Sequence, residues 1–122
     1  MAETAPAQND RAQEVLARWD QRIRQRLIPL VTEELIAEHA RNPLGQHSDA
    51  LERLLNYFRR AAPGGKLAVM CTRPFREWRI VKIAGVRRQP PSFYDDRVFH
   101  VEREAIHAVF LERIDELMRD QG

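Results

Sequence analysis

Residues 66–84, KLAVMCTRPFREWRIVKIA, contain the change of pattern that sets the fold class. Two short apolar runs, residues 66–72 and 78–84, flank the segment Arg-Pro-Phe-Arg at 73–76. Proline presets the backbone angle that turns require, so this segment is expected to reverse the chain. Two apolar runs joined by such a turn predict an antiparallel β-hairpin.

Neither face of the second predicted strand is cleanly polar. Side chains of a strand point alternately to opposite faces, which gives the sets Trp78, Ile80, Lys82 and Arg79, Val81, Ile83. A sheet that is apolar on both faces needs cover on both. We expect that cover to come from the chain's own helices or from a protein partner.

The chain before the hairpin has the apolar spacing of helices. Residues 11–28 predict an amphipathic helix with Asp10 as its N-cap. Pro29 is expected to break this helix because proline has no backbone N–H to donate. A second helical stripe runs from residue 30 to about residue 40, and the Asn-Pro-Leu-Gly turn at 42–45 stops it.

Ser48 is expected to cap a third helix, because its hydroxyl can accept a hydrogen bond from the first turn. Pro-Gly-Gly at 63–65 is predicted to end that helix. Its apolar face has the i, i+3, i+4, i+7 spacing and consists of Leu51, Leu54, Leu55 and Phe58.

After the hairpin, residues 85–96 are predicted as a loop, residues 97–101 as a third strand, and Glu102 onward as a helix. The order predicts an α+β fold with N-terminal helices, an antiparallel β-hairpin plus third strand, and a C-terminal helix. Residues 10–122 are expected to form a single domain after a disordered tail at 1–9. The stripe of the last helix consists of Ile106, Val109, Phe110, Ile114, Leu117 and Met118.

Composition is typical of a soluble, cytoplasmic protein. With 122 residues, 43% hydrophobic and 31% charged, the chain suits one modest domain. No apolar run approaches the roughly 20 residues that cross a bilayer, and residues 1–10 lack the features of a secretory signal. The lone cysteine, Cys71, fits a reducing compartment, so we expect a cytoplasmic location and no membrane partner.

Charge is unevenly distributed along the chain. Residues 59–88 hold nine basic and one acidic side chain, or about +8, whereas residues 95–122 hold four basic and eight acidic, or about −4. The fold could bring the two segments together, or the basic segment could form a surface for nucleic acid or for an acidic protein. Eighteen of the twenty cations are arginine, which favours a protein interface, and a small nucleic-acid-binding domain remains the alternative function.

No catalytic motif stands out. Cys71 lies inside an apolar run, which indicates a buried, inert thiol, and Ser48 is explained by capping. Glu104 and His107 have the spacing of a di-iron bundle, but such a bundle needs two copies and two further carboxylates. We therefore predict no catalytic, cofactor-binding or metal-binding residue in this chain.

Three blocks in colinear order resemble the small (alpha) subunit of bacterial N,N-dimethylformamidase. They are ELIAEHARNPLG at 34–45, LERLLNYFR at 51–59 and EAIHAVFLERI at 104–114. Trp78, Arg79 and Ile80 fit the hairpin of that family as well. The resemblance extends over residues 30 to 117.

The resemblance implies a division of labour between two chains. In that family a large subunit carries a mononuclear iron, held by tyrosines and a carboxylate, and hydrolyses the amide. The small subunit supports it in an α2β2 or larger hetero-oligomer, and no iron ligand carries over to this chain. This chain is thus expected to be a non-catalytic subunit that binds and stabilises the large one. The predicted interface residues are Tyr57, Arg59, Arg60, Phe75, Arg76, Trp78 and Arg79.

Overall fold

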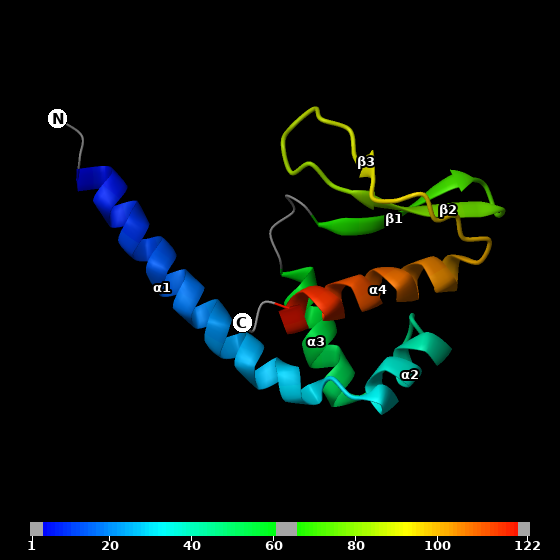
Figure 1. Cartoon of the computed structure of the whole chain (residues 1–122), viewed down its shortest axis with the longest axis horizontal. Coiled ribbons are helices and arrows are strands. Elements are labelled where there is room, and N and C mark those ends of the chain that lie inside the picture. The colour runs from blue at the N-terminus through cyan, green and yellow to red at the C-terminus, as the bar shows by residue number, and fades with distance from the viewer. Residues whose placement is uncertain (1–3, 61–65, 120–122) are drawn as a thin grey trace.

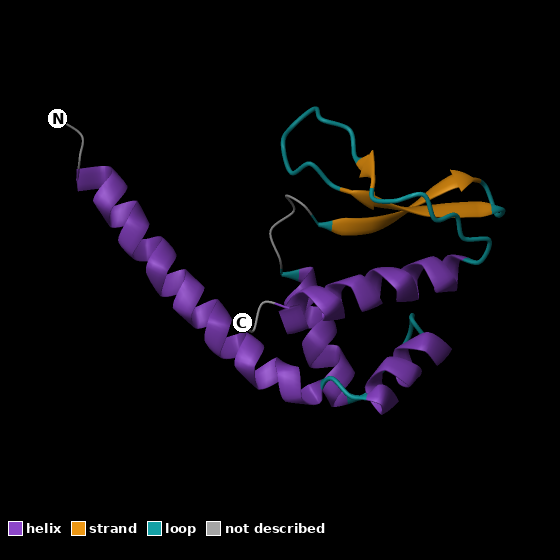
Figure 2. Cartoon of the chain, in the orientation of Figure 1, coloured by secondary structure: helices purple, strands orange, loops and turns teal. Residues whose placement is uncertain are grey.

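The computed structural model describes residues 4–60 and 66–119 and confirms the α+β fold (Figure 1). The described elements follow the predicted order of helices, hairpin, strand and helix (Figure 2). They are α1 (Thr4–Leu27), the 3-10 turn η1 (Ile28–Leu30), α2 (Glu33–Arg41), α3 (Asp49–Arg59), β1 (Leu67–Arg73), β2 (Glu77–Lys82), β3 (Ser92–Phe93) and α4 (Glu102–Arg119).

α4 is the central layer of the molecule. Figure 2 shows the sheet on one side of α4 and α2 and α3 on the other. A second, smaller core cluster joins Ala108 of α4 to Leu67 and Ile80 of the sheet. The main core cluster lies among the helices and consists of Leu27, Leu35, Leu51, Leu54, Phe58, Phe110, Ile114 and Leu117.

The predicted hairpin is confirmed. β1 and β2 pair antiparallel, with Val69 opposite Ile80 and Cys71 opposite Trp78. Ile80 and Val81 point to opposite faces of β2 and are 0% and 4% exposed. The chain itself therefore covers both faces at the centre of this strand, so the apolar faces alone do not require a partner there.

The third strand lies elsewhere than predicted. It is β3, whose Phe93 pairs with Val81, and within residues 97–101 only Phe99 forms an isolated bridge, to Trp78. Between the two pairings, Asp95 accepts hydrogen bonds from the backbone N–H and the guanidinium of Arg97. This local bonding competes with a regular ladder and explains why the pairing is interrupted.

The start of the first helix also differs from the prediction. α1 begins at Thr4, so Asp10 lies inside the helix and is not its N-cap. Residues 4–9 include alanines with high helix propensity, and Pro6 falls in the first turn, where its missing N–H costs no hydrogen bond. Residues 1–3 and 63–65 lie outside the described residues, and the division into tail and domain stays a prediction.

The predicted break at Pro29 and the predicted cap at Ser48 are confirmed, and α2 has a cap, Thr32, that was not predicted. α1 ends at Leu27, just before η1, which contains Pro29. Thr32 caps α2 by accepting from the backbone N–H of Leu35 at 3.1 Å, and Ser48 caps α3 by accepting from that of Leu51 at 3.3 Å. These breaks turn α2 and α3 back against α4 and leave most of α1 projecting from the body (Figure 1).

Candidate functional site

A groove separates α1 from α3. Its volume is about 700 Å³. The Tyr57 hydroxyl donates a hydrogen bond to Asp20 at 2.7 Å and so ties the two helices together. The lining combines an apolar floor with cations and consists of Trp19, Asp20, Ile23, Arg26, Leu27, Arg53, Asn56, Tyr57 and Arg60.

Of the predicted interface residues, Tyr57 and Arg60 line this groove, whereas Arg59 does not. The guanidinium of Arg59 donates to Asn56 at 3.1 Å on the surface of α3. The other four predicted residues belong to the hairpin, which lies on the opposite side of α4 from α3. The predicted interface residues therefore fall into separate places on the molecule.

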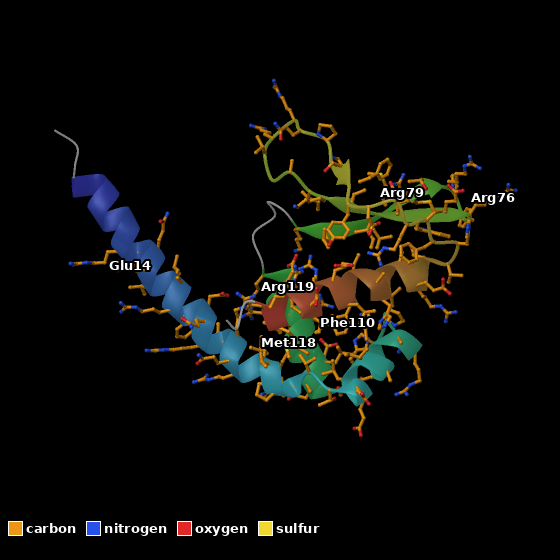
Figure 3. The ribbon with its side chains drawn as sticks, viewed as in Figure 1. Glu14, Arg76, Arg79, Phe110, Met118 and Arg119 are labelled. Carbon is orange, nitrogen blue, oxygen red and sulfur yellow. The ribbon has the colours of Figure 1, made fainter. Side chains whose placement is uncertain are left out.

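The hairpin turn presents Phe75 to solvent. Its side chain is 93% exposed, and its backbone has a φ of 62°, which a residue with a side chain rarely adopts. The backbone N–H of Arg76 donates to the carbonyl of Arg73 at 2.9 Å and closes the turn. Figure 3 labels Arg76 at this end of the hairpin. A fully exposed aromatic side chain at a strained position is a candidate contact for another protein.

Trp78 and Arg79 are engaged within the chain. The backbone of Trp78 exchanges two hydrogen bonds of 2.8 Å with Phe99. The guanidinium of Arg79 lies 3.6 Å from the centre of the Phe93 ring and donates to the carbonyl of Asp95 at 2.6 Å. Both side chains are half-buried, and the Trp78 backbone and the Arg79 guanidinium hold the segment from Phe93 to Phe99 against the sheet.

The basic and acidic segments do not neutralise each other through ion pairs among the described residues. In the basic segment, Arg73 pairs with its neighbour Glu77. In the acidic segment, Arg97 pairs with Asp95 and Glu112. The ion pairs of these described residues thus form within each segment.

A histidine pair that sequence reasoning missed lies between α2 and α4. His39 is 2% exposed, and its Nδ1 lies 2.8 Å from the Nδ1 of His107, so one ring donates and the other accepts. The ring of Phe110 stacks on His39 with centroids 3.9 Å apart, and Figure 3 labels Phe110 on α4. Burial, with His107 and His47 nearby, lowers the pKa of His39 from 6.5 to about 4.

The pair is therefore neutral near pH 7 and serves to join two helices. Burial also lowers the pKa of His107. Glu104, which the sequence placed in a helical pattern with His107, is exposed. The two rings are 68 residues apart in the chain, and the only local signal was that each lies on a predicted helix.

Among residues 11–60 and 66–119, whose side chains the structure describes, no group of three or more His, Cys, Asp or Glu could hold a metal ion. Cys71 is exposed, not buried as predicted, because it lies toward the turn end of the edge strand β1.

Within the part of the chain that the structure describes, no helix is both long and apolar enough to span a bilayer.

Comparison with known proteins gives the family. Residues 14–122 match the model of the N,N-dimethylformamidase alpha subunit family. An N,N-dimethylformamidase alpha subunit of Alcaligenes sp is 38% identical over 115 residues, which are 88% of this chain and 84% of that protein. The alpha subunit of the Paracoccus aminophilus N,N-dimethylformamidase is 36% identical over 118 residues, 91% of this chain and 81% of that one. This chain belongs to the N,N-dimethylformamidase alpha subunit family.

Proposed function

We propose that this chain is the non-catalytic small subunit of an N,N-dimethylformamidase-type amide hydrolase in the bacterial cytoplasm. It binds and stabilises a large catalytic subunit, which carries the iron, in an α2β2 or larger assembly. The family match over residues 14–122 carries this proposal, because its members are named as the alpha subunits of that enzyme.

Two features of the surface support a role in assembly. Phe75 at the hairpin turn is 93% exposed, and Leu16 and Trp19 on α1 are 65% and 62% exposed. Exposing side chains of this size costs solubility in a chain that acts alone, whereas burial against another protein removes them from water. The cations of the hairpin add charge that an acidic partner can match.

Co-expression with the large subunit tests the proposal. The tagged large subunit should retain this chain through affinity and size-exclusion steps in mild salt, and amide hydrolysis should require both chains. Hydrolysis by the isolated, iron-loaded small chain would contradict the non-catalytic role. Separation of the two chains in mild salt would contradict the proposal as a whole.

A nucleic-acid-binding domain is the second candidate, favoured by the positive charge of residues 59–88. Exposed Arg87 and Arg88 lie in the loop before β3 and could contact phosphates. Binding would then fall steeply as salt rises. Gel shifts at low salt with duplex and single-stranded probes test this, and unshifted probes eliminate it.

A further inference from the structure

The apolar stripe of α1 continues past the part of the helix that the core covers. Leu27 is buried, and Ile23 packs against the main core cluster. One and two turns earlier, Trp19, Leu16 and Val15 are 62%, 65% and 59% exposed. We call these three residues the arm stripe. Figure 1 shows this part of α1 projecting from the body, and Figure 3 labels Glu14 on it, far from the sheet.

An uncovered helix of this kind has little to stabilise it. Isolated helices are marginal in water, and most helical stability in proteins comes from packing an apolar face. The arm stripe continues the face that packs at Ile23 and Leu27, so a partner that covers it would extend the existing core along α1.

The α1–α3 groove lies at the base of the arm stripe and includes Trp19 in its lining. Arg26, Arg53 and Arg60 also line it, and Asp20 is its one carboxylate. Asp20 already accepts from Tyr57 at 2.7 Å and lies 4.0 Å from Arg24. Arg53 is paired with Asp49 at 3.0 Å, so Arg26 and Arg60 carry the positive charge beside the apolar side chains of the groove.

A second copy of this chain is a poor match for the same surface. Residues 11–27 carry five arginines and two carboxylates, Glu14 and Asp20. Two such helices packed against each other would bring like charges together, which opposes association. An acidic partner removes this conflict, because its carboxylates can pair with the arginines that line the groove.

We propose that the arm stripe and the α1–α3 groove together bind one segment of the large catalytic subunit. That segment presents apolar side chains to Leu16 and Trp19 and carboxylates to Arg26 and Arg60. This inference rests on the proposed function and deepens it, because it assigns the surface and the chemistry of the partner. The inference places α1 in the interface, in addition to the hairpin and α3, whose residues were already predicted to contact the partner.

The test uses the full chain co-expressed with the tagged large subunit. L16E/W19E places two carboxylates on the arm stripe. L44E/V86E is the matched control, because Leu44 and Val86 are 58% and 60% exposed and lie outside α1. We expect L16E/W19E to weaken the complex at least tenfold and L44E/V86E to leave it within about twofold of wild type.

A second pair of variants tests the charge of the partner. R26E/R60E reverses two cations of the groove, and R87E/R88E makes the same change in the loop before β3. The groove variant should weaken the complex more and reduce its sensitivity to salt, because it removes pairs with carboxylates. Circular dichroism of each variant should match that of wild type if the exposed substitutions leave the helices intact.

The outcomes separate this inference from the proposed function. If wild type co-purifies and L16E/W19E binds no worse than L44E/V86E, the inference is overturned and the proposed function stands. If wild type itself does not co-purify, the proposed function fails and the inference falls with it. A self-associated wild type that L16E/W19E turns into monomers would assign the stripe to a second copy and overturn the inference.

Discussion

Replacing His39 with phenylalanine should flatten the dependence of stability on pH in mildly acidic solution. In the folded chain the His39 pKa is about 4, because burial and the neighbouring His107 and His47 disfavour the imidazolium. In the unfolded chain it returns to about 6.5. Between these values the unfolded chain holds one more proton than the folded chain, so stability falls as pH falls.

The difference between the folded and unfolded pKa values of His39 sets how much stability is lost on acidification. Each unit of pKa corresponds to about 1.4 kcal/mol, so His39 contributes up to about 3 kcal/mol that is present above pH 6.5 and lost by pH 4. The H39F ring can still stack on Phe110, where the native centroids lie 3.9 Å apart. It binds no proton, so this part of the pH dependence disappears.

Urea unfolding followed by circular dichroism at pH 7.5, 6.0 and 4.5 measures the effect. Wild type should lose about 2 to 3 kcal/mol more than H39F between the highest and lowest pH. At pH 7.5 H39F itself is less stable than wild type, because His107 loses its hydrogen-bond partner. H100F, which removes an exposed histidine, is the control. An H39F pH dependence equal to that of wild type would refute the buried, neutral pair.

Three further substitutions test the account. R113M removes the guanidinium that donates to the backbone carbonyls of Phe58 and Leu67 and should cost about 2 to 3 kcal/mol in urea unfolding, whereas R103M at an exposed site of α4 should cost little. S48A removes the cap of α3 and should cost about 1 kcal/mol of unfolding free energy. S48D should not restore that stability, although aspartate is otherwise a good cap, because the Glu38 carboxylate lies beside the Ser48 hydroxyl. A melting temperature of S48D equal to that of wild type would contradict this prediction. F75G should keep or raise the melting temperature, because glycine adopts the φ of 62° without strain. The same variant should weaken binding to the large subunit in a pull-down, and unchanged binding would show that the hairpin turn is not part of the interface.

The parts of the fold that local chemistry decides could be predicted from the sequence. Pro29 ends α1 because it cannot donate, and Ser48 caps α3 because its side chain reaches the backbone of the same turn. The hairpin followed from two apolar runs around Pro74. In each case the residues that determine the structure lie within a few positions of one another.

The third strand, the histidine pair and the exposure of Cys71 were not predicted correctly, because they depend on contacts beyond the local sequence. The position of the third strand depends on Arg97, which pairs with Asp95 nearby and with Glu112 on α4. The histidine pair joins residues 68 positions apart, and no spacing rule connects them. The exposure of Cys71 depends on which strand forms the sheet edge, and an apolar run does not reveal that.

The candidate interface was predictable only in part. Aromatic and arginine residues near the hairpin were chosen by residue type, which could not tell that Phe75 is exposed and that Arg79 is engaged with Phe93. Trp19 lies in the amphipathic helix predicted at residues 11–28. Periodicity gives the direction of such a stripe, but not where the core stops covering it.

The central claim is that this chain associates with the large subunit. The mass of the co-expressed complex in solution tests that claim most directly. Light scattering on the peak that elutes when both chains are co-expressed should give one hetero-oligomer that contains equal numbers of the two chains. Amide hydrolysis should elute with that peak. Two separate peaks in mild salt, with all activity in the large chain alone, would contradict the account.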